Sequence, residues 1–178
     1  MSALPAWAAF PLPHLHSVAL AVAIRGGPRY EGRGEQGRTH FMEHMVFRGA
    51  GRHDSLAEVM SAFERVGAEP EAYTSEDSIT LLLELDPARV REGLELLADI
   101  LLRPTWRDLE SERAVILEER LERVDESGTP CDLDDIGLAL AFPGHPAGRS
   151  ILGRRRDIDA VKREDLEAWR AKIVTRAN

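Results

Sequence analysis

Residues 38–50 read Arg-Thr-His-Phe-Met-Glu-His-Met-Val-Phe-Arg-Gly-Ala, and the five residues from His40 to His44 within them decide how the chain is interpreted. Apolar residues recur at helical spacing from residue 39 to residue 47, so we predict a helix there. Residues four apart on a helix lie on the same face. His40 and His44 can therefore present imidazole nitrogens to one metal ion, as the inverted zinc signature H-x-x-E-H requires.

Glu43 lies beside this pair without being a ligand, and that position suits a general base. Zinc lowers the pKa of a bound water towards ~7, and a neighbouring carboxylate can then take its proton. Attack of this water on a carbonyl makes peptide hydrolysis the natural reaction. The competing interpretation is two surface histidines and a glutamate on an exposed helix face.

A catalytic zinc also needs a third protein ligand and an open position for water. We predict a long helix over residues 108–126, and its spacing alone does not choose among its acidic residues. The candidates are Glu110, Glu112, Glu118, Glu119 and Glu122.

The rest of the chain predicts an α+β fold, with helices packed on one face of a mostly antiparallel sheet. At 178 residues it has room for one domain with a real core, which we assign to residues 1–178. Leu94, Leu97 and Leu101 are expected in that core, whereas His53 is expected at the surface or in a turn and Cys131 in a structural role. The expected strands are 17–25, 69–74 and 79–85, and the other expected helices are 55–66, 86–103, 132–141 and 163–174.

Bulk composition excludes several classes of protein. The net charge of −8 argues against nucleic-acid binding, which depends on basic side chains. No segment offers the ~20 uninterrupted apolar residues of a membrane-spanning helix, and the first 24 residues read as a short irregular start rather than a signal peptide. Cys131 is the only cysteine, so a metal site must use histidine and carboxylate ligands, and we expect a reducing, cytoplasmic location.

Four stretches of the chain resemble the pitrilysin or insulinase family of metallopeptidases, which includes the processing peptidases. The similarity runs from about Ser17 to Asn178. The stretches that carry it are Arg38 to Ala50, Ala72 to Asp77 (Ala-Tyr-Thr-Ser-Glu-Asp), Glu112 to Glu119 (Glu-Arg-Ala-Val-Ile-Leu-Glu-Glu), and Gly144 to Gly153 (Gly-His-Pro-Ala-Gly-Arg-Ser-Ile-Leu-Gly).

The resemblance implies one zinc ion per chain, with Glu119 as the third ligand. It also implies that Glu112, two helical turns earlier, acts as a carboxylate that orients a ligating histidine; Glu118 is the alternative if the alignment slips. A peptide substrate would add as an extended strand beside Glu71, Ala72 and Tyr73, mainly through backbone hydrogen bonds.

Three departures from the family pattern bear on activity. Glu71 stands where members usually carry an asparagine that can donate a hydrogen bond to substrate. The family's usual first and last strands and its second domain are absent from residues 1–178. We therefore expect a homo-oligomer or a complementary chain of the same family to complete the site. The alternatives are a non-catalytic scaffold subunit, which keeps the fold and perhaps the zinc, and a fragment of a longer polypeptide.

Overall fold

The computed structural model describes residues 6–178, and residues 1–5 lie outside its description. Its sheet contains three antiparallel strands in the order β1-β3-β2, which are β1 (Val18–Arg25), β2 (Glu69–Thr74) and β3 (Ser78–Leu85). The polar turn between β2 and β3 is short, so the two strands form a hairpin, and β1 pairs with the other side of β3.

Side chains alternate between the two faces of this sheet, as the period of a strand requires. The inner face of β3 is fully apolar and buried, whereas Glu84 is exposed on the outer face. The inner residues of β3 are Ile79, Leu81, Leu83 and Leu85. Only one face of the sheet therefore needs a covering layer.

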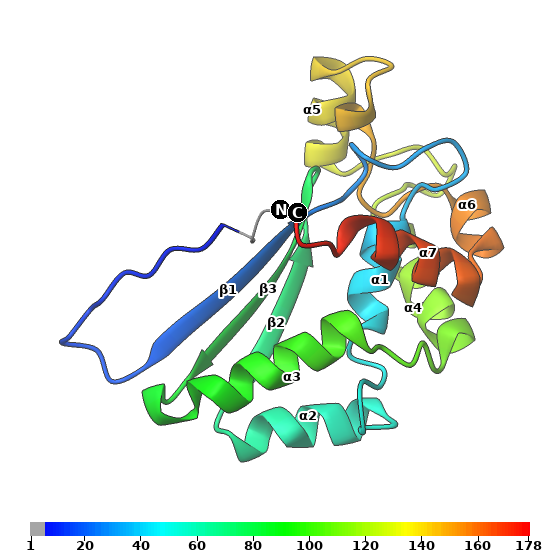
Figure 1. Cartoon of the computed structure of the whole chain (residues 1–178). Coiled ribbons are helices and arrows are strands. Elements are labelled where there is room, and N and C mark those ends of the chain that lie inside the picture. The colour runs from blue at the N-terminus through cyan, green and yellow to red at the C-terminus, as the bar shows by residue number, and fades with distance from the viewer. Residues whose placement is uncertain (1–5) are drawn as a thin grey trace.

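The helices supply that layer and a second group of helices packs behind it (Figure 1). Three helices contact the strands, namely α1 (Arg38–Met45), α2 (Leu56–Arg65) and α3 (Val90–Leu102), the last preceded by the short 3-10 helix η1 (Pro87–Arg89). Helices α4 (Leu109–Leu121) and α7 (Arg163–Ile173) pack against α1, and α6 (Arg155–Ala160) packs against α4 at the outer edge. Helix α5 (Leu133–Ala141), with the 3-10 helix η2 (Pro146–Gly148), projects from the rest.

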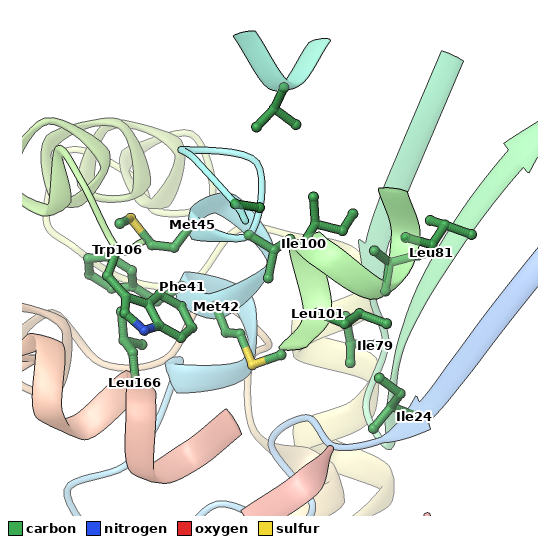
Figure 2. Close-up of a cluster of buried hydrophobic side chains, with 14 of the residues drawn as sticks. Ile24, Phe41, Met42, Met45, Ile79, Leu81, Ile100, Leu101, Trp106 and Leu166 are labelled. Carbon is green, nitrogen blue, oxygen red and sulfur yellow. The ribbon is translucent and has the colours of Figure 1, made fainter. Parts of the chain in front are cut away.

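Helix α1 lies at the centre of the hydrophobic core, with other elements on both sides of it (Figure 2). Phe41, Met42 and Met45 are fully buried. They are part of one cluster with Ile100 on the α3 side and Leu166 on the α7 side. Burial of a side chain of this size contributes about 1.5–3 kcal/mol. Packing therefore fixes α1 in place before any metal is considered.

The predicted fold class is confirmed, and so are the strands and most helices to within about two residues. The helix predicted over 108–126 is too long, because α4 ends at Leu121. The carboxylate of Asp125 accepts hydrogen bonds from the N–H groups of Ser127 and Thr129, and this local turn competes with helix. Among the described residues, no helix combines the length and the apolar character needed to cross a membrane.

The smaller expectations for Leu94 and Cys131 are wrong, and of the two places expected for His53 the structure shows the turn. Leu94 is 47% exposed because α3 approaches the sheet at Gly93, so the next residue is turned away from the core. His53 is buried in the turn that follows Ala50, with which it exchanges backbone hydrogen bonds. Cys131 is exposed, so it has no packing role.

Candidate metal centre

The start of α1 is held by a carboxylate from the loop before it. Gly37 precedes the helix with a φ of 88°, a conformation that favours glycine, and it has no side chain to cap the helix. Glu31 does this instead, because its carboxylate accepts hydrogen bonds from the N–H groups of Gly37 and Thr39, both at 2.8 Å, and from the Thr39 hydroxyl at 2.9 Å. Burial raises the pKa of Glu31, and the hydrogen bonds act in the opposite direction.

The C-terminal part of the chain also fixes the start of α1. The indole N–H of Trp169 donates to the Thr39 hydroxyl at 3.1 Å, and Arg38 pairs with Asp165 at 2.8 Å. Gly153 has a φ of 72°, and a Cβ there would lie 2.4 Å from the carbonyl oxygen of Gln36. The stretch from residue 144 to 153 therefore matters because its backbone touches the loop in front of the motif helix.

His40, His44 and Glu119 converge on one point. The Nε2 atoms of both histidines lie 3.5 Å from Oε2 of Glu119, and the candidate ligand atoms all lie within 4.8 Å of one another. Ligand atoms around a tetrahedral zinc are roughly 3.4 Å apart, given bonds of about 2.0–2.2 Å. The donor set and its spacing therefore fit a metal ion such as zinc.

The charges of these groups also suit metal binding. Burial lowers the pKa of His40 to about 4, so the imidazole is neutral and has a lone pair for a metal. The adjacent imidazole of His44 lowers the pKa of Glu119, which keeps that carboxylate ionised. A neutral imidazole and an anionic oxygen are the protonation states that a metal requires.

Glu112 lies behind His44 rather than beside the metal position. Its side chain is 3% exposed, and its Oε2 atom lies 3.1 Å from Nδ1 of His44. A carboxylate in contact with Nδ1 holds the proton on that nitrogen, so Nε2 is free to face Glu119. The other predicted candidates point elsewhere: Glu118 and Glu122 are exposed, and exposed Glu110 pairs with Arg113.

Glu43 is positioned by a residue of the sheet. The hydroxyl of Thr74, at the end of β2, donates to Oε2 of Glu43 at 2.6 Å. Burial raises the pKa of Glu43, whereas the Thr74 hydrogen bond lowers it. The second carboxylate oxygen is left for a water or substrate atom. The arrangement provides a base with a defined orientation next to the three converging groups.

A cavity of about 260 Å³ adjoins the centre and is lined by both polar and apolar side chains. The polar lining residues are Glu43, His44, Arg48 and Glu112, and the apolar ones are Phe47, Leu56, Met60, Pro70 and Ala72. A larger cavity of about 590 Å³ between α2 and α3 contains none of the predicted site residues.

The structure separates the three predicted substrate contacts. Ala72 faces the cavity, whereas Glu71 and Tyr73 lie on the outer face of β2, opposite Leu82 and Thr80. Their side chains therefore point away from the metal centre. Strand β2 does form an edge of the sheet among the described residues, so addition of a peptide strand there stays a prediction.

Sequence reasoning missed three residues that support the centre: Glu31, Arg48 and Thr74. Glu31 had no visible signal, because it lies in a polar, glycine-rich loop. Thr74 was part of the strand noted for substrate binding, and its proximity to Glu43 depends on how α1 packs against β2. Arg48 belongs to the quoted motif stretch, and its ion pair with Glu112 depends on how α4 packs against α1.

The fold and the donor set together define a metallopeptidase-type domain, and comparison with known proteins specifies the family. Residues 12–155 match the model of the family described as Insulinase (Peptidase family M16). The chain belongs to this family, as its resemblance indicated.

Curated relatives agree with this assignment. The chain is 34% identical over 159 residues to the mitochondrial-processing peptidase subunit beta of Lentinula edodes, covering 88% of this chain and 34% of that protein. It is 31% identical over 167 residues to an uncharacterized zinc protease of Mycobacterium tuberculosis, covering 92% and 37%. The chain thus spans little more than a third of these relatives.

Solved structures share the fold. A protease from Helicobacter pylori superposes with a TM-score of 0.76 at 25% identity, covering 90% of this chain and 39% of that one. The peptidase M16 inactive domain from Pseudomonas fluorescens gives a TM-score of 0.77 at 18% identity, covering 88% and 38%.

Proposed function

We propose that this chain is the zinc-binding catalytic half of an endopeptidase that hydrolyses extended peptides. One observation carries the proposal: two imidazole nitrogens lie 3.5 Å from one oxygen of Glu119, with Glu43 next to them. The zinc protease named among its relatives supports zinc as the metal. One ion per chain is held by His40, His44 and Glu119.

The residues of the chain divide the chemistry among them. Bound zinc supplies an acidified water and a positive charge that stabilises an oxyanion. Glu43 takes the proton of the attacking water and later delivers it to the leaving amine. Thr74 holds one oxygen of Glu43, so the other stays directed at the reacting atoms. Glu112 fixes the ring of His44, and the free edge of β2 holds the peptide in an extended form.

The active form is an oligomer or a complex with a complementary chain of the family. A relative named as a subunit of a processing peptidase supports this. Full peptidase activity of a strictly monomeric preparation would contradict this part of the proposal.

A non-catalytic scaffold subunit is the second candidate. Glu71 stands where an amide donor is usual in the family, but its side chain points away from the metal centre, so it does not decide between the two candidates. A structural neighbour described as an inactive domain shows that the fold exists without activity. The complete set of His40, His44, Glu43 and Glu119 favours the catalytic candidate.

The deciding experiment measures zinc per chain by elemental analysis, together with the native mass and peptide turnover. We expect close to one zinc in the parent protein and in Glu43→Gln, with turnover lost only in that variant. Glu119→Gln should lose zinc, and the adjacent, exposed Glu118→Gln is its matched control. A parent protein that binds no zinc, even when zinc is offered, refutes the peptidase proposal. Zinc binding without turnover in any oligomeric state selects the scaffold.

A further inference from the structure

We propose that Arg48 is a positioning residue of the metal centre, which acts on the metal through Glu112 and His44. It holds the buried Glu112 carboxylate in the orientation in which Glu112 accepts a hydrogen bond from the Nδ1–H group of His44. The proposal rests on the zinc site proposed above, and it concerns how tightly that site binds its metal.

The geometry links the three side chains in one row. Arg48 lies four residues after His44, in the turn that ends α1, where its N–H donates to the Met45 carbonyl at 3.0 Å. Its guanidinium pairs with Oε1 of Glu112. The other oxygen, Oε2, lies 3.1 Å from Nδ1 of His44. The two carboxylate oxygens thus have separate partners, and each partner restricts the rotation of the carboxylate.

Burial makes the guanidinium necessary. The Glu112 side chain is 3% exposed, and among the described residues its ion pairs are with Arg48 and His44 alone. Removing one partner of a buried ion pair leaves an uncompensated charge, which is strongly unfavourable. Without Arg48, Oε1 of Glu112 has no ion-pair partner, and the carboxylate is drawn towards solvent. This movement weakens its hold on His44.

The effect reaches the metal through the imidazole. A carboxylate behind a ligating histidine fixes the tautomer and raises the basicity of the ligand nitrogen. Loss of such a partner typically reduces metal affinity about 10–100-fold. Arg48 acts on His44 only through Glu112. The loss of zinc affinity on removing Arg48 should therefore approach the loss on removing Glu112 and should not exceed it.

A substrate-binding role is the alternative for Arg48, since its side chain also lines the cavity of about 260 Å³. The contact with Glu112 argues against this role, because the positive charge of Arg48 is already neutralised by a carboxylate that lines the same cavity. The two roles differ in what they change. A positioning residue alters zinc affinity in the absence of substrate, and a substrate anchor does not.

The test measures zinc affinity by chelator competition, without any peptide. Arg48→Met should weaken zinc binding about 10–100-fold, and Arg48→Lys should recover most of that loss by restoring the charge. The double variant Arg48→Met with Glu112→Gln should bind zinc no more weakly than Glu112→Gln alone. It also removes the buried charge of Glu112 together with its partner, so this variant is informative even if Arg48→Met alone folds poorly. Arg89→Met is the matched control and should leave zinc affinity unchanged, since Arg89 pairs with Glu92 and lines the larger cavity between α2 and α3.

The outcomes separate this proposal from the function itself. If Arg48→Met binds zinc as tightly as the parent protein, or if the two losses add in the double variant, Arg48 has no positioning role. An unchanged zinc affinity with an altered KM assigns Arg48 to substrate instead. A parent protein without zinc affinity removes the zinc site and this proposal together.

Discussion

Glu31→Gln is the substitution with the most informative consequence outside the metal ligands. Glu31 is 3% exposed and accepts three hydrogen bonds from the first residues of α1 and their N-cap. Glutamine keeps one acceptor oxygen and turns an NH₂ group towards a backbone N–H. At least one donor at the start of the motif helix then loses its partner, in a place that water does not reach.

The magnitude follows from two opposing contributions. A hydrogen bond to a charged group contributes about 1.5–3 kcal/mol, and a buried donor without a partner costs a similar amount. The substitution also removes the cost of burying the charge, which is the main reason that the pKa of Glu31 is raised. The expected net loss is about 1–3 kcal/mol. For a domain of this size, a loss of about 2 kcal/mol corresponds to a fall in Tm of roughly 4–8 °C.

Urea denaturation of the metal-free protein, followed by tryptophan fluorescence, measures this loss. Glu35→Gln is the matched control, because Glu35 lies in the same loop and accepts a hydrogen bond from Gly32, but its side chain is 29% exposed. We expect less than about 1 kcal/mol for the control. Equal stabilities for the parent protein and Glu31→Gln, or a larger loss in the control, would refute the assignment of Glu31 as the cap of α1.

Three further predictions concern the base, a backbone contact and the pH dependence. Thr74→Val should lower peptide turnover about 10-fold, because Glu43 loses the hydrogen bond that orients it. Zinc content should stay unchanged and Thr74→Ser should restore turnover; a loss of zinc in Thr74→Val would contradict this prediction. Gly153→Ala should cost at least about 2 kcal/mol more in urea denaturation than Gly144→Ala, since both glycines have a positive φ but only the first Cβ meets a backbone oxygen, at 2.4 Å. The metal-free protein should lose stability as pH falls from 6.5 towards 4, because the unfolded chain protonates His40 while the folded chain does not; the same slope in His40→Gln would contradict this.

The ligand histidines were predictable because their relation is local. A spacing of four residues on one helix brings His40 and His44 together whatever surrounds them. Glu119 is different, because its place depends on the packing of α4 against α1 over a long sequence separation. Spacing alone left five glutamates of this helix as candidates for the third ligand, and the resemblance to a known family selected Glu119. Its convergence with the histidines in the structure agrees with that selection.

The parts that sequence did not predict depend on tertiary contacts or on short, polar elements. Helix α6 begins within the run of arginines at residues 154–156, where no helix was predicted, and only Asp157 and Ile158 are buried in it. Such a helix has little periodic signal. Likewise, nothing in the local sequence indicates that the hydroxyl of Thr74 reaches Glu43, because the contact joins a strand to a helix across the core.

The contacts at the start of α1 also determine when the metal site can form during synthesis. The histidines are translated early, but the residues that fix their helix come late: Arg149 donates to the Glu31 carbonyl at 2.6 Å, Gly153 touches Gln36, and Trp169 donates to Thr39. A nascent chain that has released α4 from the ribosome already contains every ligand, the general base and the capping Glu31, while the contacts from Arg149, Gly153 and Trp169 are still missing. A product truncated at that point carries the full motif in its sequence but lacks these later contacts to the start of its helix.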